Sequence, residues 1–382
     1  MRVSCLQENL KRGLAIVGRA VAAKSTLPIT SNILLATDEG RLRLSATNLE
    51  IGITCWIGAK VENDGAITIP AKLLSEFVSA LPNDRIDLTL TGKTLRLKCA
   101  RFEARMNGQD ADDFPPVATW EESAADTVQS SVTLDPETLR DAIAQVVFAA
   151  ATDDARPVLA GVLLQIGEDE MTMAAADGFR LSVRRVAVLE RTGDEPIEII
   201  VPAKSLSELG RVLSDQEDPV RVVIPRGKGQ ILFHLNGVDL VSQLIQGNFP
   251  NYAQLIPQDF SSRVVVNTDD FLAATRPAAI FARDSNGIVR IEMFPGEDLA
   301  PGKMIIRARA EELGDNQGEI DATVEGSEAK IAFNAKYLTD VLSVMDAAQV
   351  AIETKSPSSP GVVRPIGEDA FTHVIMPMFV TW

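Results

Sequence analysis

The stretch Ile69-Pro70-Ala71-Lys72-Leu73-Leu74-Ser75-Glu76-Phe77 occurs three times along the chain in related form. It returns as Val201-Pro202-Ala203-Lys204-Ser205-Leu206-Ser207-Glu208-Leu209, and again as Phe333-Asn334-Ala335-Lys336-Tyr337-Leu338-Thr339-Asp340-Val341. The lysine of each copy lies 132 residues after the one before it. A solenoid repeat has a period of about 20–50 residues, whereas domains cluster near about 100–150 residues. The period therefore predicts one small domain in triplicate.

Two further patterns keep the same order within each period. The helical pattern Glu8-Asn9-Leu10-Lys11-Arg12-Gly13-Leu14 has counterparts at residues 136–142 and 270–276. The closing signal Asp113-Phe114-Pro115 recurs as Asn248-Phe249-Pro250, and the third copy lacks it. The polar stretches at residues 121–126 and 256–262 are predicted linkers. Together these features predict domains at residues 1–122, 128–256 and 262–382.

Each repeat is predicted to hold two helices and roughly eight strands. Apolar residues of the first helix recur at helical spacing, at Leu10, Leu14 and Val17. Alternating runs such as residues 41–46 and 94–99 are typical of half-buried strands. The expected fold class is therefore α+β, with antiparallel sheets that helices cover on one face. The expected helices span residues 7–21, 71–81, 135–149, 203–213, 268–283 and 335–345.

The charge of the chain is unevenly distributed. A net charge of −16 over 382 residues argues against a simple nucleic-acid binder with a basic patch. The six expected helices together carry +1, which leaves 17 net negative charges on the rest of the chain. This pattern fits one mildly basic surface on an acidic body. Ordinary solvated helix faces remain the alternative.

Nothing in the sequence indicates export or a membrane. The first ten residues contain no apolar run, and no stretch of about 18 apolar residues occurs. Cys5, Cys55 and Cys99 are odd in number, and two of them lie in apolar strand-like runs. We therefore expect buried, reduced thiols rather than disulfides or metal ligands, and a cytoplasmic protein.

No constellation of residues in the sequence suits catalysis. His234 and His373 lie in different repeats, and neither has a carboxylate or cysteine at metal-ligand spacing. Gly92-Lys93-Thr94 is similar to the end of a phosphate-binding loop but lacks the loop's first glycine, so we expect a hairpin turn. The paired acids Asp112-Asp113 and Asp153-Asp154 are expected in a turn and a loop. We expect a protein that is not an enzyme and has no cofactor and no metal site.

Four motifs, taken in order, resemble a known family. They are Ser25-Thr26-Leu27-Pro28-Ile29, Ala175-Ala176-Asp177-Gly178-Phe179-Arg180-Leu181, Gly247-Asn248-Phe249-Pro250-Asn251-Tyr252 and Val374-Ile375-Met376-Pro377-Met378. With the three-fold period, the whole chain resembles the bacterial DNA sliding clamp, the beta subunit of the replicative DNA polymerase III holoenzyme. The resemblance implies three repeats of the DNA-clamp fold and a head-to-tail dimer. That dimer would be a six-domain ring with helices lining the hole and sheets outside.

The resemblance also implies a function and a set of partners. The ring would encircle double-stranded DNA without sequence specificity and would act as a processivity factor. DNA polymerase III alpha, the clamp loader, other DNA polymerases and repair proteins would bind through short clamp-binding peptides. Those peptides would bind in a groove between repeats two and three, and apolar and methionine side chains suit such a groove.

Site residues are carried over from the family position by position. The predicted groove residues are Arg156, Leu159, Ala176, Gly178, Phe179, Leu181, Pro250, Gln254, Leu255, Val374, Ile375, Met376, Pro377 and Met378. Plain core packing is the alternative for the apolar members of this set. Lys24, Lys72 and Lys204 are the predicted DNA-facing residues, and Ile280 and Phe281 are predicted to form the homodimer interface.

The chain departs from the family at three places. Its end, Met378-Phe379-Val380-Thr381-Trp382, replaces a basic residue and leucine, so we expect the tail 379–382 to cover part of the groove or to favour aromatic peptide anchors. Pro157-Val158 stands where some members place aromatics near DNA. Pro277 is expected to kink its helix or to mark its start. A triplicated enzyme or an adhesin-like scaffold is the alternative for the whole chain.

Overall fold

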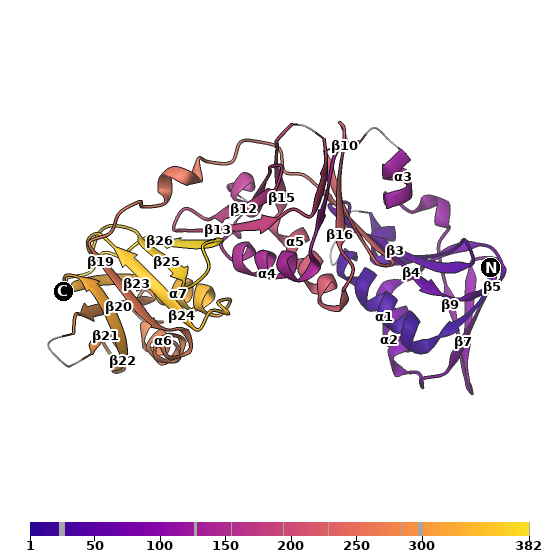
Figure 1. Cartoon of the computed structure of the whole chain (residues 1–382). Helices are drawn as coiled ribbons and strands as arrows, with labels where there is room; N and C mark the ends of the chain where they lie inside the picture. Colours follow the sequence, from indigo (N-terminus) through magenta and orange to yellow (C-terminus); the bar gives the residue numbers. More distant parts are fainter. Residues whose placement is uncertain are drawn as a thin grey trace. The chain divides into compact units, whose positions relative to one another are not determined.

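The computed structural model describes the chain except for residues 23–26, 126–127, 154, 194, 228, 284, 297–300 and 382, and the side chains of residues 123–129. The chain divides into two compact units. Unit 1 comprises residues 1–137, 188–195 and 211–244, and unit 2 comprises residues 138–187, 196–210 and 245–382. Figure 1 labels the helices and strands along the colour gradient.

Unit 1 contains the first repeat and part of the second. Its helices are α1 (Gln7–Val17), α2 (Ala71–Ala80) and α3 (Trp120–Ala125). Its strands are β1 (Arg2–Leu6), β2 (Asn32–Asp38), β3 (Arg41–Thr47), β4 (Ile51–Gly58), β5 (Lys60–Asn63), β6 (Ala66–Pro70), β7 (Arg85–Thr91), β8 (Thr94–Cys99), β9 (Phe102–Asn107), β10 (Val128–Leu134), β14 (Glu190–Thr192), β16 (Val220–Pro225), β17 (Gln230–Leu235) and β18 (Val238–Gln243).

Unit 2 contains the rest of the second repeat and the third repeat. Helices α4 (Pro136–Val147) and α5 (Ala203–Val212) lie mainly in it, together with α6 (Thr268–Ala282) and α7 (Ala335–Leu342). Its strands are β11 (Gly161–Ile166), β12 (Glu170–Ala176), β13 (Arg180–Ala187), β15 (Ile197–Pro202), β19 (Ser262–Asn267), β20 (Ile288–Phe294), β21 (Gly302–Ala310), β22 (Gly314–Gly326), β23 (Ala329–Asn334), β24 (Gln349–Thr354), β25 (Gly361–Pro365) and β26 (Phe371–Ile375).

The six helices that apolar spacing predicts are confirmed as α1, α2, α4, α5, α6 and α7. Side-chain caps begin α6 and α7. The Asn267 side chain accepts a hydrogen bond from the Asp270 amide at the start of α6, and the Asn334 side chain accepts one from the Lys336 amide at the start of α7. Such caps satisfy amides that have no partner inside the helix. Each Ala-Lys stretch forms a helix that follows directly after a strand, as in β6–α2, β15–α5 and β23–α7.

The structure overturns one local expectation and one half of another. The linker expected at residues 121–126 includes most of α3, which begins at Trp120. The Trp120 amide donates a hydrogen bond to the Asp239 carboxylate at 2.7 Å, and the Trp120 ring stacks on His234 at 4.9 Å between centroids, so the sheet fixes this segment. Pro277 is expected to kink its helix or to mark its start. It lies inside α6, so it does not mark the start, and the kink stays a prediction.

Strand pairing joins the repeats into continuous sheets. In unit 1 a sheet of order β14-β10-β16-β17-β18-β4-β3-β2-β6 crosses between repeats where β18 pairs with β4. A second sheet there has the order β5-β1-β7-β8-β9. In unit 2 the order is β15-β11-β12-β13-β26-β25-β24-β19-β22-β21-β20-β23, and the crossing is the pairing of β13 with β26. All these pairings are antiparallel, as the fold class predicts.

The two crossings use corresponding strands. Each repeat contains a meander of three antiparallel strands: β2–β4 in the first, β11–β13 in the second and β20–β22 in the third. The last strand of each meander is β4, β13 or β22. The strands β9, β18 and β26 are each the last strand of a repeat. Inside the chain, the last strand of one repeat pairs with the meander end of the repeat before it.

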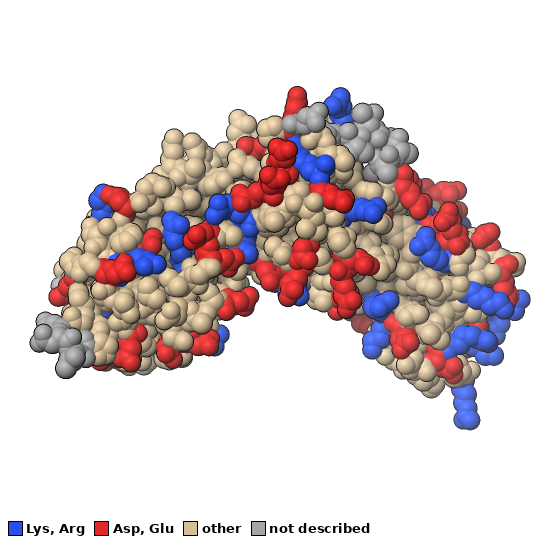
Figure 2. All heavy atoms as spheres, in the orientation of Figure 1, with Lys and Arg blue, Asp and Glu red and all other residues tan. Residues whose placement is uncertain are grey.

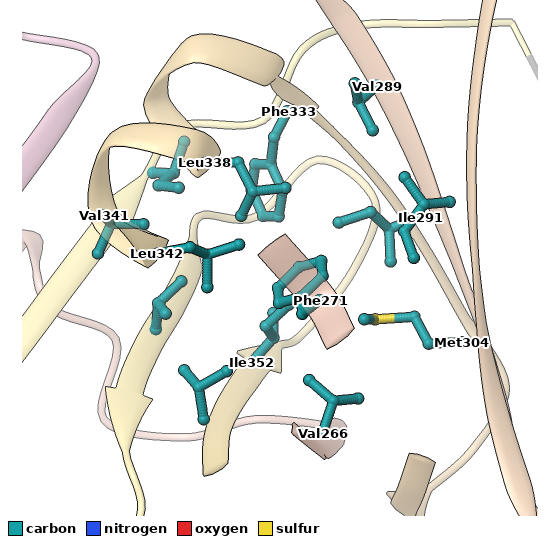
Figure 3. Packing of buried hydrophobic residues seen from close by; sticks show 14 of the residues in the cluster. Val266, Phe271, Val289, Ile291, Met304, Phe333, Leu338, Val341, Leu342 and Ile352 are labelled. Atoms are coloured by element: carbon teal, nitrogen blue, oxygen red, sulfur yellow. The ribbon is translucent and has the colours of Figure 1, made fainter. Parts of the chain in front are cut away.

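The third repeat has a closed apolar core between its helices and sheets. Figure 3 shows Phe271 of α6 and Leu338, Val341 and Leu342 of α7 packing against strand residues such as Ile352. Each of these side chains is almost fully removed from water. Burial on this scale contributes about 1.5–3 kcal/mol for each large apolar side chain, which holds both helices on the sheets.

The thiols and the imidazoles are structural. Cys5, Cys55 and Cys99 are free and buried, as expected, and burial raises the pKa of the Cys5 thiol to about 12. His373 is buried beside the Ser182 hydroxyl, 2.7 Å from its Nδ1, and burial, with a smaller effect of the Arg180 charge, lowers its pKa to about 3. Contrary to the expectation from residue spacing, His234 has a carboxylate beside it: its Nδ1 lies 2.6 Å from Asp239.

Candidate peptide-binding surface

Apolar side chains of unit 2 form one cluster, called the peptide surface below. They come from β11, β12, β13, β15 and β26 and from the segment after β18, so residues far apart in sequence meet there. Its buried members are Leu163, Ala174, Ala176, Leu181, Val183, Ile200, Phe249 and Val374. Partly buried members packed against them are Val158, Leu159, Ile245, Tyr252 and Ile256.

The structure brings four of the predicted groove residues into this cluster. They are Leu159, Ala176, Leu181 and Val374. Ile375 lies elsewhere, because successive side chains of a strand point to opposite faces. It is fully buried in the core of the third repeat, so it supports the surface from behind and does not line it.

Exposed apolar side chains extend the surface toward solvent. Phe179, Leu255 and Met376 are large apolar residues that stay exposed. The Met376 amide donates a hydrogen bond to the Phe179 carbonyl at 2.8 Å, so the ends of β13 and β26 hold these two residues side by side. Of the other predicted residues, Pro250 and Gln254 are exposed, and Pro377 and Met378 are half-buried. Phe179 and Met376 therefore form an exposed apolar pair, and exposed apolar patches mark binding surfaces.

The turn between β12 and β13 places Phe179 at the edge of the surface. The Asp177 carboxylate accepts hydrogen bonds from the amides of Phe179 and Arg180, at 2.8 and 3.0 Å. Gly178 has a φ of +93°, and a Cβ there would lie 2.9 Å from Nη1 of Arg156. The positive φ favours glycine here, whereas the flexible end of the Arg156 side chain could move aside for a larger residue.

Arg156 supplies a positive charge at the rim of the peptide surface. Its Nη1 donates to the Asp177 carbonyl at 2.8 Å, and its Nη2 donates to the Asp153 carboxylate at 3.0 Å. The hydrogen bond from Arg156 is the main reason that the pKa of Asp153 lies below its usual value. The guanidinium remains exposed, so a carboxylate of an incoming peptide can compete with Asp153 for it.

Arg180 fastens the β13 edge to the third repeat. Its side chain is almost fully buried, with Nε donating to Asp177 at 3.0 Å and Nη1 donating to Asp340 of α7 at 2.6 Å. The guanidinium lies over the rings of Phe148, at 5.3 Å, and Tyr337, at 4.5 Å. The role of Arg180 is not evident from its motif, because Asp340, Phe148 and Tyr337 are remote from it in sequence.

The C-terminal tail follows a path that both other repeats share. The Met378 amide donates to the Ala332 carbonyl, as Ile245 does to Ile200 and Gln109 does to Thr68. Beyond it, the Phe379 side chain is 89% exposed, so it does not cover the peptide surface. That expectation for the tail is wrong at Phe379, and Trp382 lies outside the described residues.

The remaining predicted residues lie on helices. Lys72 of α2 and Lys204 of α5 are exposed, and Lys72 lies 4.0 Å from Glu76 one turn further on. Lys24 lies outside the described residues. Ile280, near the end of α6, is 58% exposed, whereas Phe281 is partly buried against the core of its own repeat.

Acidic and basic side chains are mixed on the surface. Figure 2 shows acidic and basic side chains interspersed, with basic ones gathered over the part of unit 1 that carries β5, β7 and β9. In the described part of the chain, no three His, Cys, Asp or Glu residues are grouped to hold a metal ion. No described helix is long and apolar enough to cross a membrane.

Comparison with known proteins identifies the family. Three models of the DNA polymerase III beta subunit match the chain, the N-terminal domain at residues 1–118, the central domain at 133–251 and the C-terminal domain at 253–379. The chain is 32% identical to the beta sliding clamp of Synechococcus elongatus over 384 residues, which covers 99% of each protein.

Solved structures agree with the family models. The sliding clamp of Bacillus subtilis superposes with a TM-score of 0.91 at 27% identity, over the full length of both chains. A sliding clamp of Pseudomonas aeruginosa, solved bound to griselimycin, superposes with a TM-score of 0.90 at 28% identity, again over both full chains. The chain therefore belongs to the DNA polymerase III beta subunit family, the bacterial DNA sliding clamps, which act as processivity factors of replication.

Proposed function

We propose that two copies of the chain close head to tail into a ring that encircles duplex DNA. One observation carries this proposal: the chain leaves open the two strands that a third crossing would need. β9 is the last strand of its sheet, so one of its edges is open. In β22, residues 314–322 pair with β21 on one side only, because β19 pairs with residues 323–326 further along the strand. Both crossings inside the chain pair the strands that correspond to β9 and β22. An open edge of this kind is a template for another chain.

The correspondence also gives the register of the proposed contact. Gly52 pairs with Val241 at the first crossing, and Leu181 pairs with Val374 at the second. In the third meander, Asp315 corresponds to Gly52 and Leu181. In β9, residue 105 corresponds to Val241 and Val374, so Asp315 would face the arginine at position 105 of the second copy. Continuing the antiparallel register sets Glu319 opposite residue 101, which is also an arginine. Opposite charges that face each other across strands stabilise the pairing, which supports this closure.

A charge swap tests the register. Arg105→Glu sets a carboxylate against Asp315 and should weaken association by about 1.5 kcal/mol or more at each interface, as should Asp315→Arg. Combining both changes restores opposite charges and should restore a particle of twice 41.2 kDa in sedimentation velocity. A double variant that dissociates as much as the two single changes predict together would reject this register.

The ring would hold DNA through its topology and not through sequence. The helices are close to neutral on an acidic chain, so few phosphates can be neutralised, and phosphate contacts carry no sequence information. Lys72 and Lys204 are the proposed DNA-facing residues. The proposal makes the chain a non-catalytic factor without cofactors that works in the cytoplasm, where bacterial DNA is copied. Its three clamp domains are proposed to span residues 1–122, 128–256 and 262–382.

The peptide surface is proposed to recruit the partners of the clamp. Its apolar floor, exposed anchors and single rim arginine suit a short extended peptide with two or three apolar side chains and a polar or acidic start. DNA polymerase III alpha, the clamp loader and other polymerases and repair proteins would present such peptides in turn. Micromolar binding corresponds to about 8 kcal/mol, which allows exchange between partners.

Calorimetry with a capped hexapeptide that has a polar start and leucine and phenylalanine anchors tests the surface. Met376→Ala removes an exposed anchor contact and should cost about 1–2 kcal/mol of binding free energy. Deleting residues 379–382 should weaken an aromatic-anchored peptide, because Phe379 is free to contact it. Leu189→Ala, which truncates an exposed leucine of unit 1, is the matched control. If neither Met376→Ala nor the deletion changed the affinity, this surface would not be the site that binds the peptide.

A further inference from the structure

The two crossings inside the chain can be compared row by row, because direct cross-strand partners share a face of the sheet. Thr68 and Ile200 each lie four residues before the repeated lysine, and they pair with Leu34 and Leu163. Partners further along the same two rows therefore correspond between the crossings. They are Thr54, Asp239 and His234 at the first crossing, and Val183, Thr372 and, with the register of β25 continued by one residue, Arg364 at the second.

The linker after the first repeat, residues 114–120, covers the first crossing. Val117 lies on Gly52, where an added Cβ would be 2.7 Å from Cγ1 of the valine. Three residues later, the ring of Trp120 stacks on His234 at 4.9 Å between centroids. An aliphatic side chain and an aromatic side chain three residues apart therefore hold this segment of the chain on the face of the sheet.

The linker after the second repeat makes different contacts beside the second crossing. The hydroxyl of Tyr252 donates a hydrogen bond to Oε1 of Gln165 on β11 at 2.8 Å. Leu255 follows the Phe-Pro pair at the same distance in sequence as Trp120 does in the first linker, but its side chain is 53% exposed. The second linker therefore does not supply the aromatic contact that the first one makes.

The second crossing nevertheless keeps partners for such a contact. Arg364 replaces the histidine, and its side chain is 36% exposed, with Nε 3.4 Å from Glu353 and without a hydrogen bond among the described residues. A guanidinium is planar and stacks on aromatic rings. Thr372, which is half-buried, replaces Asp239, whose carboxylate accepts a hydrogen bond from the Trp120 amide at 2.7 Å.

We propose that a peptide bound on the peptide surface follows the path that the first linker takes on its own crossing. An aliphatic anchor of the peptide packs on Leu181 and Val374, and an aromatic side chain three residues later stacks on the guanidinium of Arg364. The hydroxyl of Thr372 accepts a hydrogen bond from the amide of that aromatic residue. This inference rests on the proposed function and adds to it a residue that selects partners with an aromatic side chain at this spacing.

Calorimetry with two capped octapeptides tests this path on the full chain. One peptide has the sequence of residues 114–121, and the other is its Trp120→Ala version. The tryptophan peptide should displace the apolar hexapeptide, and the alanine version should bind about fivefold more weakly, because it lacks the stacking contact. On the Arg364→Gln chain the two octapeptides should bind nearly equally. Arg364→Lys should restore only part of the difference, since an ammonium group lacks the guanidinium plane.

Arg263→Gln is the matched control for the loss of charge. Arg263 also pairs with Glu353, at 3.3 Å, so this variant should keep the full difference between the two octapeptides. Equal midpoints of urea unfolding for the native chain and Arg364→Gln would show that the variant is folded. A difference that Arg364→Gln and Arg263→Gln reduce equally would indicate general charge attraction and would overturn the inference.

Two further results would overturn it. The tryptophan peptide could fail to displace the hexapeptide, or the two octapeptides could differ as much on Arg364→Gln as on the native chain. The hexapeptide separates this outcome from failure of the proposed function. If Met376→Ala weakens the hexapeptide while Arg364→Gln leaves the octapeptide difference intact, only the path is wrong. If Met376→Ala has no effect on the hexapeptide, the peptide surface is wrong and the path falls with it.

Discussion

Replacing Ile280 and Phe281 with alanine is expected to convert the dimer into monomers. Ile280 is 58% exposed near the end of α6. This helix packs on β21 and on β22, the strand whose edge is open for a second copy. Truncating a large buried apolar side chain costs about 2–5 kcal/mol. A closed ring buries the pair at two interfaces, so the loss counts twice, and sedimentation at nanomolar concentration should show a particle of 41.2 kDa.

The two residues differ in what they do for the single chain. Phe281 also packs against its own core, so Phe281→Ala should lower the free energy of unfolding as well as association. Ile280→Ala should weaken association and leave unfolding nearly unchanged, which makes it the cleaner variant. Leu189→Ala is the control for truncation of an exposed apolar residue. A double variant that stays dimeric at nanomolar concentration would show that this face does not close the ring.

Arg180→Met is expected to destabilise the third repeat by about 3–5 kcal/mol, because removing one partner leaves buried charge uncompensated. Arg180 is 8% exposed and shares the carboxylates of Asp177 and Asp340. Methionine keeps most of the volume and the contact with the rings of Phe148 and Tyr337, so the loss reports on the charge.

Urea unfolding of the variant, followed by far-ultraviolet circular dichroism, measures this effect. Arg185→Met is the matched control, since Arg185 lies on the same strand but is exposed. The hexapeptide should also bind Arg180→Met more weakly, because Asp177, which shapes the turn carrying Phe179, loses a partner. Equal midpoints and equal peptide affinities for the two variants would show that Arg180 does not fasten the peptide surface.

The sequence predicts the parts of this fold that periodicity controls. The three Ala-Lys helices and the strands that lead into them follow from one period, and the cap at Asn334 supports the start of the third. Long-range pairing is less accessible. Nothing local in the sequence indicates that β18 pairs with β4, because that choice depends on packing between repeats.

The candidate surface shows the same division. Leu159, Ala176, Leu181 and Val374 were predicted from a resemblance, and they meet in one cluster. Ile375 was carried over with its neighbour, although strand alternation sends its side chain into another core. The partner of His234 depends on the register of the β17–β18 hairpin, and the Asp340 partner of Arg180 depends on how α7 packs beside β13. A single sequence contains neither.

The most direct test of the ring joins its two proposed edges covalently around DNA. Asp315→Cys and Arg105→Cys, combined in one chain, would face each other across each proposed interface, and the native cysteines are buried and do not compete. After loading on a nicked circular plasmid and oxidation, the account predicts a closed dimer that stays on the circle in high salt and denaturant and leaves once the plasmid is cut. Oxidised chains that leave the intact circle as readily as linear DNA would contradict it.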